Sequence, residues 1–296
     1  MSSSEPTTSA RSVVVTGANS GIGLATVLEL AGAGYDVLGT VRSADKAERV
    51  QAAAAERGVG VRTVELDVDD DTSCAEGFAR IAELTDGGPW AVVNNAGFAQ
   101  SGAVEDVPDA AVRAQLETNV VAPMRIARLV LPRMKARGDG RIVNISSVAG
   151  RTSQPLMGWY CASKHALEAV SDALRMEVEP DGVRVVLVEP GMFGTDIWSA
   201  AQEGGFPEPS SARYAAAYAR AQAVAARSDR LPDPVWVART VRLALANPVP
   251  LARYVVGADA ASGIVAETLL PTVVTDLVKA ATAGLRTSPL RLPFLP

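Results

Sequence analysis

Short runs of apolar, β-branched residues alternate with longer alanine-rich stretches along most of this chain. The apolar runs predict strands at residues 12–16, 35–41, 61–66, 90–93, 141–145, 183–188 and 253–256. The stretches between them predict helices at residues 22–33, 46–57, 73–84, 110–135, 158–179 and 234–246. Strands that are almost continuously apolar are typical of a parallel sheet covered on both faces. The alternation of strand and helix therefore predicts a doubly wound α/β fold.

The regular pattern loosens after Pro190, and this divides the chain into parts. We expect a single Rossmann-type domain at residues 12–259, with a central parallel sheet and helices on both faces. Residues 191–232 are rich in glycine, proline, serine and alanine, and we expect a substrate lid there, with a poorly ordered surface excursion as the alternative. Residues 1–11 predict a disordered polar tail, and residues 260–296 predict an extension packed on the pocket or at a subunit interface.

Charge and cysteine content argue against several classes of function. The net charge is −5 and no basic stripe stands out, so no nucleic-acid partner is expected. Two cysteines, Cys74 and Cys161, do not make a disulfide framework, and a single histidine, His165, leaves too few ligands for a zinc site. Without a metal, acid–base chemistry falls mainly to tyrosine, lysine or carboxylates.

No segment of the chain carries a strong membrane signal. The N-terminus lacks the apolar core of a signal peptide. Residues 264–283 are the nearest candidate for a membrane segment, but Glu267, Pro271, Asp276 and Lys279 interrupt them. We expect this segment to cover the pocket or contact a partner subunit, with contact to a membrane surface less favoured and no stable insertion. We expect a cytoplasmic protein. We also expect it to assemble as a homodimer or homotetramer.

A glycine-rich turn, Thr16-Gly17-Ala18-Asn19-Ser20-Gly21-Ile22-Gly23, joins the first predicted strand to the first predicted helix. Gly17 permits the tight turn, Gly21 the close approach of a pyrophosphate, and Gly23 the packing of helix on strand. The helix N-terminus presents free N–H groups and a positive dipole end to the phosphates. An ordinary tight turn is the alternative, but the strand–turn–helix context favours a dinucleotide site made by Gly17, Asn19, Ser20, Gly21, Ile22 and Gly23.

The spacing of these glycines resembles the cofactor turn of the short-chain dehydrogenase/reductase family. Further motifs follow in that family's order, and the resemblance covers residues 12–257. They are Asn94-Asn95-Ala96-Gly97, Asn119, Ser146-Ser147, Tyr160-Cys161-Ala162-Ser163-Lys164 and Pro190-Gly191. A tyrosine and a lysine four residues apart occur by chance in many proteins, whereas the whole ordered set does not. Residues 253–257 and the long tail are similar to the branch that contains steroid and retinol dehydrogenases.

The resemblance implies contacts with a nicotinamide dinucleotide at the ends of several predicted strands. The residues implied are Asp67 at the adenine with Val68 beside it, Asn94, Ala96 and Gly97 after the fourth strand, Tyr160 and Lys164 at the catalytic motif, and Pro190, Gly191 and Thr195 at the nicotinamide.

The end of the second predicted strand indicates which dinucleotide is used. A carboxylate there would hydrogen-bond the ribose 2′-hydroxyl of NAD, whereas an arginine accommodates the 2′-phosphate of NADP. The chain has Val41 at that place, followed by Arg42. NADP(H) is therefore favoured over NAD(H), with a solvated surface Arg42 as the alternative.

Tyr160 and Lys164 are four residues apart on a predicted helix and therefore share one face. Hydride chemistry requires a proton donor to the nascent alkoxide, or a base in the reverse direction. A free tyrosine has a pKa of about 10, and we expect the Lys164 ammonium to lower the pKa of Tyr160. Ser147 would hydrogen-bond the substrate oxygen. The resemblance adds that Lys164 holds the nicotinamide ribose and that Asn119 joins a proton relay through a water.

Large apolar residues surround the catalytic motif and indicate the substrate class. We expect Ser147, Tyr160, Met157, Met192 and Phe193 to contact the substrate. Further candidates for the pocket wall are Phe98, Gln154, Pro155, Leu156, Gly158, Trp159, Ile197 and Trp198. This set predicts a small hydrophobic carbonyl or alcohol of steroid, retinoid, fatty or polyketide-like type, although several of these side chains would also suit a core.

Taken with the motifs, these residues predict an NADP(H)-dependent oxidoreductase that interconverts a ketone and a secondary alcohol. The alternatives are an NAD-linked alcohol dehydrogenase in the oxidative direction and a non-catalytic dinucleotide-binding sensor. A sensor needs no proton relay, so the presence of Asn119, Ser147, Tyr160 and Lys164 argues against it. An epimerase or dehydratase of the related extended families fits less well, because those favour a different glycine spacing and a longer substrate domain.

Overall fold

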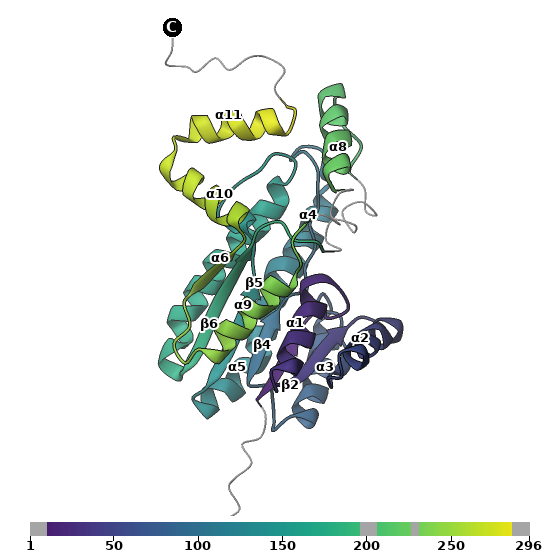
Figure 1. Ribbon diagram of the computed structural model, residues 1–296, viewed down its shortest axis with the longest axis vertical. Coiled ribbons are helices and arrows are strands. Elements are labelled where there is room, and N and C mark those ends of the chain that lie inside the picture. Colours follow the sequence, from purple (N-terminus) through teal and green to yellow (C-terminus); the bar gives the residue numbers. More distant parts are fainter. Residues whose placement is uncertain (1–10, 196–205, 226–230, 286–296) are drawn as a thin grey trace, which may run out of the picture.

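The computed structural model describes residues 11–195, 206–225 and 231–285 (Figure 1). Most of the expected N-terminal tail, residues 196–205 and 226–230 of the expected lid, and the end of the expected extension lie outside the described residues. Within the described part, the predicted strands are all present and their ends shift by two residues at most. The apolar pattern was therefore a reliable guide to the sheet.

The centre of the fold is a seven-stranded parallel sheet in the order β3-β2-β1-β4-β5-β6-β7. The strands are β1 (Ser12–Val15), β2 (Asp36–Val41), β3 (Arg62–Glu65), β4 (Ala91–Asn94), β5 (Gly140–Ile145), β6 (Val183–Pro190) and β7 (Arg253–Val256). Val13 of β1 lies opposite Val37 of β2 on one side and Ala91 of β4 on the other. The strand order reverses beside β1, which confirms the doubly wound α/β fold.

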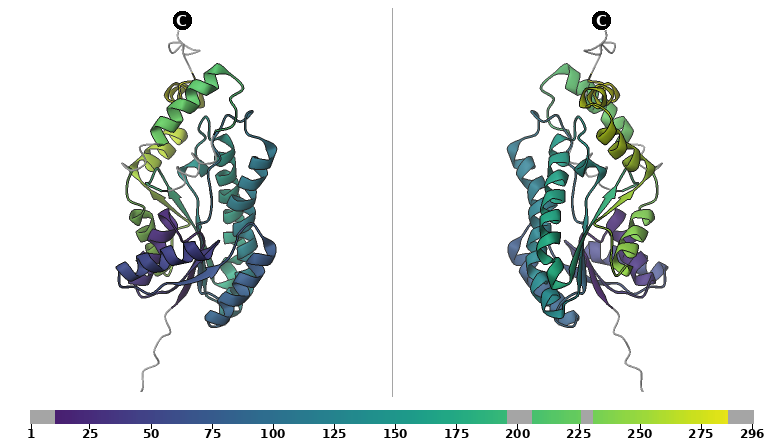
Figure 2. Two further views of the ribbon diagram at one scale, coloured as in Figure 1. Left: turned by 90° about the vertical axis from the view of Figure 1, so that its right-hand side faces the viewer. Right: turned by 90° about the vertical axis from the view of Figure 1, so that its left-hand side faces the viewer.

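Helices cover both faces of this sheet, as the edge-on views in Figure 2 show. They are α1 (Gly21–Gly32), α2 (Ala44–Glu56), α3 (Asp71–Leu84), α4 (Asp109–Leu116), α5 (Ala122–Arg137), α6 (Gly158–Val178), α8 (Ala212–Ala225), α9 (Val235–Ala246), α10 (Ala258–Leu269) and α11 (Thr272–Thr282). Successive strand side chains point to opposite faces. Val13 and Val15 therefore pack in the core with α1, α2 and α9, while Val14 packs in the core with α3 and α5.

The long helix predicted at residues 110–135 is interrupted. A π-helical turn, η1 (Glu117–Val121), separates α4 from α5 and contains Asn119. The residues on either side of the turn are still helical, so the sequence pattern predicted one continuous helix. Such π-turns occur frequently at functional sites.

The C-terminal part of the described chain forms two helices above the carboxyl ends of the strands (Figure 1). The domain boundary expected after residue 259 falls inside α10, which begins at Ala258. The apolar segment 264–283 is divided by Pro271, which lies between α10 and α11 and has an extended ψ of 138°. No helix in the described ranges is long and apolar enough to cross a membrane.

The fold predicts a sharp difference between two glycines of α1. A Cβ atom at Gly23 would lie 2.1 Å from the carbonyl oxygen of Gly17, whereas Gly32 has open space around it. Gly23→Ala should therefore lower the free energy of unfolding by about 1–3 kcal/mol through overpacking. Gly32→Ala, the matched control, should leave it unchanged or raise it by up to about 1 kcal/mol. Denaturant unfolding measures both, and equal effects would contradict this packing.

Candidate active site

A cavity of about 740 Å³ opens at the carboxyl ends of the strands. Its walls come from the segments that follow β1 to β6 and from α8 and α11. Ligands of open α/β sheets bind at this edge, beside the point where the strand order reverses. The cavity therefore occupies the place where this fold holds its ligands.

Most residues predicted for the site line this cavity. They are Gly17, Asn19, Ser20, Gly21, Ile22, Gly23, Arg42, Asp67, Val68, Ala96, Gly97, Ser147, Met157, Tyr160, Lys164, Pro190, Gly191, Met192, Phe193 and Thr195. Asn94 and Asn119 are not among the lining residues. Gly158 and Trp159 also lie away from the wall, and Ile197 and Trp198 lie outside the described residues.

The glycine-rich turn has the backbone shape that its sequence predicts. Gly17 and Gly21 have φ angles of 64° and 51°, in the left-handed region that favours glycine. The N-cap of α1, Ser20, makes no side-chain hydrogen bond to the first turn of the helix. Within the described part of the chain, the N–H groups of Gly21, Ile22 and Gly23 have no hydrogen-bond acceptor, so they are available to an anionic ligand. Thr195 packs against Gly21, since a Cβ there would lie 3.1 Å from the Thr195 Cβ.

Asn95 rather than Asn94 supports this turn. The Asn95 side-chain amide donates to the carbonyl oxygens of Thr16 at 2.8 Å and Gly17 at 3.1 Å. Asn94 is the last residue of β4 and donates instead to the Asn144 side chain at 2.8 Å, inside the sheet. The two asparagines are adjacent, so their side chains point to opposite faces of the strand. The motif alone does not say which face each one takes.

Two cationic residues lie together at the end of the cavity beyond β2. Arg42 and Lys46 both line it. Lys46 was not predicted for the site, although its spacing of four residues from Arg42 at the start of a helix was a usable signal. Asp69 lines the same end, and burial raises its pKa while a 2.9 Å hydrogen bond from Thr118 and the Arg42 charge lower it. Two cations, Arg42 and Lys46, are therefore available to an anionic group at this end, beside the carboxylates Asp67 and Asp69.

The Tyr160 hydroxyl lies in a buried environment. Burial raises the pKa of Tyr160 to about 12, against a hydrogen bond with Ser147 that lowers it. The expectation that Lys164 lowers this pKa is wrong, because the pKa is raised and burial is the largest cause. The Lys164 ammonium lies 5.8 Å from the centre of the tyrosine ring, and desolvation of the phenolate outweighs other effects. Tyr160 is therefore a neutral phenol at neutral pH.

Lys164 is also buried, with 6% of its surface exposed. Its ammonium donates to the Ile145 carbonyl oxygen, at the end of β5, over 2.9 Å. Burial lowers the pKa of Lys164 to about 8, and the charge of Glu168 opposes this change. The lysine thus changes charge just above neutral pH, and Glu168 helps to keep it protonated.

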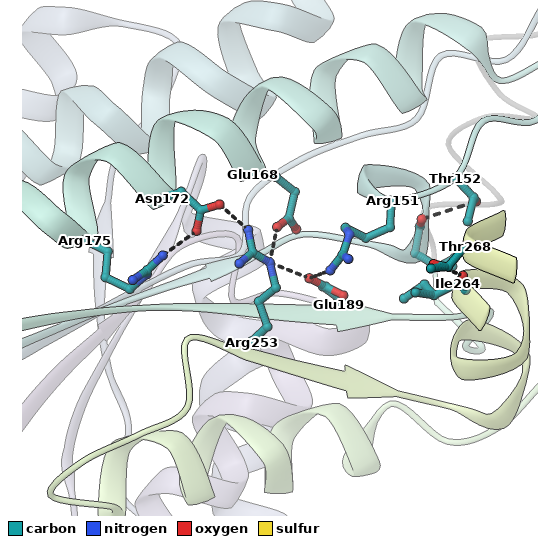
Figure 3. Close-up of polar contacts among 10 residues, drawn as sticks. Arg151, Thr152, Glu168, Asp172, Arg175, Glu189, Arg253, Ile264 and Thr268 are labelled. Carbon is teal, nitrogen blue, oxygen red and sulfur yellow. Dashed lines mark hydrogen bonds and ion pairs between the residues drawn. The ribbon is translucent and has the colours of Figure 1, made fainter.

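Glu168 belongs to a charged network that Figure 3 shows. Arg253 of β7 contacts Glu168 at 3.0 Å, the fully buried Glu189 at 3.1 Å, and Asp172. Glu189 is the residue before Pro190 in β6, and Arg151 pairs with it at 3.4 Å. Burial raises the pKa of Glu189. The network therefore connects α6 to the two strands at the far side of the cavity.

Ser147 lies at the surface of the cavity, whereas Asn119 lies behind it. Ser147 lines the cavity, and its hydroxyl accepts a hydrogen bond from the Ala149 N–H at 3.1 Å. The Asn119 amide donates to the Phe98 carbonyl oxygen and to the Ser163 hydroxyl, both at 3.0 Å. Asn119 therefore holds the loop after β4 against α6, one layer behind the cavity wall.

The apolar part of the wall lies beyond Tyr160. Leu156 has a φ of 66°, which is costly for a branched side chain, and its carbonyl oxygen accepts from the Gly102 N–H at 2.8 Å. Further residues of this wall are Phe98, Gln154, Pro155, Leu156, Met157, Met192, Phe193, Phe206, Ala217, Ala221 and Leu231. This end of the cavity is suited to a hydrophobic molecule.

Comparisons with known proteins agree with this geometry. A family model described as short chain dehydrogenase matches residues 11–204. The uncharacterized oxidoreductase YusZ of Bacillus subtilis is 39% identical over 194 residues, and the match spans 63% of this chain and 66% of that protein, slightly less than two thirds. The NADPH-dependent 3-dehydrocapnine reductase of Ornithobacterium rhinotracheale is 34% identical over 252 residues, which span 83% of this chain and 88% of that protein.

A solved structure extends the likeness to three dimensions. A variant of the actinorhodin polyketide ketoreductase, solved with NADPH, matches with a TM-score of 0.72 and 27% identity, over 86% of this chain and 97% of that one. The family model covers more than half of the chain, and the reductase of O. rhinotracheale is matched over most of its length. On its sequence motifs, its sheet and its cavity, the chain belongs to the short-chain dehydrogenase/reductase family, whose members are oxidoreductases that use a nicotinamide dinucleotide.

Proposed function

We propose that the protein is an NADP(H)-dependent oxidoreductase that interconverts a ketone and a secondary alcohol on a hydrophobic substrate. One observation carries the proposal: Ser147, Tyr160 and Lys164 line a single cavity that begins at the glycine-rich turn. A dinucleotide that starts at the turn would reach these three residues, and the apolar wall beyond them offers space for the carbonyl compound.

The residues present fit a nicotinamide dinucleotide. The free N–H groups of the first turn of α1 would bind its pyrophosphate, and Lys164 would hold the nicotinamide ribose. Arg42 and Lys46 would bind a 2′-phosphate, and Val41 provides no carboxylate to repel it. When bound, the cofactor supplies the hydride. The NADPH named for the O. rhinotracheale reductase and for the ketoreductase structure supports the choice of NADP(H).

Tyr160 is the proposed proton donor. As hydride adds to the carbonyl carbon, the oxygen gains negative charge and takes the hydroxyl proton of Tyr160, so the product is a neutral alcohol. The Ser147 hydroxyl donates a hydrogen bond to the same oxygen and stabilises the developing charge. A phenol whose pKa is about 12 holds its proton at neutral pH, which suits the reductive direction.

Lys164 supports this transfer through its charge. A protonated ammonium beside the ring stabilises the phenolate that remains once the proton has left. Because burial lowers the pKa of Lys164 to about 8, this help is lost as the pH rises through that value. Glu168 raises the pKa of Lys164 and so extends the pH range in which the lysine is charged. Glu168 is therefore a positioning residue that acts through Lys164.

The alternatives of the sequence analysis differ in what they require. A dinucleotide-binding sensor would not need a buried tyrosine and lysine whose pKa values are shifted beside the ligand cavity. An NAD-linked dehydrogenase would be served best by a carboxylate at the end of β2, where Val41 stands. Both properties favour the NADP(H)-linked reductase.

Removal of the proposed proton donor tests the chemistry directly. Tyr160→Phe should lower kcat for ketone reduction by about 100- to 10,000-fold, the range that general acid catalysis contributes. Binding of NADPH, followed by its fluorescence, should persist. Tyr35→Phe makes the same chemical change at the Trp90 ring, away from the cavity, and should retain activity. Full activity of the Tyr160 variant would exclude the mechanism.

Cofactor choice is tested at the cationic end. Arg42→Ala should raise KM for NADPH by about tenfold or more and KM for NADH much less, because a charge-assisted hydrogen bond contributes about 1.5–3 kcal/mol. Lys46→Ala should act in the same direction. Arg49→Ala, on the exposed side of the same helix, is the control. Equal effects of Arg42→Ala on both cofactors would refute the assignment.

The role of Glu168 has a signature in pH dependence. Glu168→Gln removes the charge that raises the pKa of Lys164, so this pKa should fall below its value of about 8. The alkaline limb of kcat/KM against pH should move to lower pH by the same amount. The chain has four lysines, which makes Lys164 readily assignable in a ¹³C NMR titration. Asp172→Asn is the control, because Asp172 also pairs with Arg253. This variant should leave the alkaline limb of the pH profile where it is in the wild-type protein.

A further inference from the structure

The outer end of the cavity is formed by two helices that meet above the sheet, α8 and α11 (Figure 1). On α8 the cavity is lined by Ala217, Arg220 and Ala221, which are three and four positions apart, and by the neighbouring Gln222. On α11 the lining residues Lys279, Thr282 and Ala283 have the same spacing. Each helix therefore presents one face to the cavity. Both faces combine small residues with a single cation.

Charge is distributed unevenly between the two ends of the cavity. Among the described residues that line it, the carboxylates are Asp67 and Asp69, and both belong to the end that also holds Arg42 and Lys46. Beyond Tyr160 the described lining side chains include two cations, Arg220 and Lys279, and no carboxylate. A ligand in the substrate part of the cavity thus meets apolar walls and positive charge.

The Arg220 guanidinium lies at the C-terminal end of α11. Gly284 follows that helix with a φ of 73°, and a Cβ atom there would lie 2.4 Å from a guanidinium nitrogen of Arg220. The carbonyl end of a helix carries partial negative charge, which favours a cation in this place. In residues 11–195, 206–225 and 231–285 no carboxylate pairs with Arg220, so most of its N–H donors are free.

Lys279 lies close enough to Cys161 of α6 for its charge to act on that thiol. It forms an ion pair with Glu267 of α10, and its side chain is 22% exposed. Burial raises the pKa of the Cys161 thiol, and the positive charge of Lys279 opposes this change. Cys161 is the neighbour of Tyr160 in α6, so the field of Lys279 reaches the residue next to the proposed proton donor. Arg220 and Lys279 together exceed the charge of Glu267 by one.

We propose that Arg220 and Lys279 bind an anionic group of the substrate itself, so that the natural substrate is an amphipathic keto acid or hydroxy acid. Its hydrophobic part lies against the apolar wall, and its carboxylate, sulfonate or phosphate faces α8 and α11. This inference rests on the proposed function and specifies its substrate class. Charge-assisted hydrogen bonds to a guanidinium and an ammonium would also set the distance between the anionic group and the reacting carbonyl.

Matched substrates test the inference. We would measure kcat/KM with NADPH for a series of medium-chain keto acids that differ in the spacing between ketone and carboxylate. Each acid would be compared with the corresponding primary amide, which is uncharged. The wild-type protein should prefer the acid at one spacing by about tenfold or more, the effect of one charge-assisted hydrogen bond. The preference should shrink as ionic strength rises, because Arg220 is exposed to solvent.

Variants assign the preference to the two cations. Arg220→Gln and Lys279→Gln should each reduce the acid-to-amide ratio by about tenfold, and Glu267→Gln, which frees Lys279, should increase it. Arg213→Gln is the matched control, since Arg213 lies on the same helix and stacks on Tyr214 instead of lining the cavity. Its ratio should equal that of the wild type.

The outcomes separate the two proposals. If the wild-type protein reduces neither acids nor amides with NADPH or NADH, the proposed function fails. If it reduces both equally well at every spacing, the proposed function stands and the anion site is refuted. If Arg220→Gln lowers the activity on acid and amide alike, the arginine only joins α8 to α11, and the inference is again refuted.

Discussion

The buried ammonium of Lys164 is the constraint on which the rest of the site depends. A charged group in an apolar interior is costly unless it is hydrogen-bonded and paired. Lys164 meets this requirement with the Ile145 carbonyl oxygen at 2.9 Å and with Glu168, one turn further along α6. Because Ile145 ends β5, these contacts hold α6 at the carboxyl edge of the sheet. Tyr160, one turn before the lysine, then faces the cavity.

Arg253 connects Glu168, the partner of Lys164, to the C-terminal part of the chain. Its guanidinium contacts carboxylates from α6 and from β6, and it stands on β7, directly before α10. Glu189 is fully buried and lies beside the Pro190-Gly191 segment of the cavity wall. Removing one partner of such a network leaves an uncompensated buried charge, which is far more costly than the pair is stabilising. The network therefore links α6, which carries Lys164, to β7, the strand that leads into α10.

The cavity combines three electrical environments along its length. Arg42 and Lys46 share one end with the carboxylates Asp67 and Asp69, the buried phenol and ammonium occupy the middle, and Arg220 and Lys279 make the other end positive. In the apolar middle, desolvation keeps Tyr160 protonated and brings the pKa of Lys164 close to neutrality. An anionic cofactor and an anionic substrate can thus approach from opposite ends without placing their charges next to each other.

By itself, the sequence determined the elements and the order in which their motifs occur. The β-branched runs located each strand of the described part of the chain, because burial on both faces leaves a continuous apolar signature. The glycine-rich turn and the tyrosine–lysine pair were also local, since each depends on spacing within one turn or one helix. The π-turn around Asn119 and the choice between Asn94 and Asn95 were not accessible in this way. Both depend on which side chain the neighbouring strand or helix accepts.

The protonation states in the site and the set of residues that line it depend on the tertiary structure. The sequence pattern predicted a lower pKa for Tyr160 because it placed a lysine one turn away, but the depth of burial has the opposite and larger effect. Arg220 and Lys279 are far apart along the chain and carry no motif, so their shared cavity follows only from how α8 and α11 pack above the sheet. Local spacing encodes which groups stand together on one element, whereas desolvation and long-range pairing arise only when the elements pack.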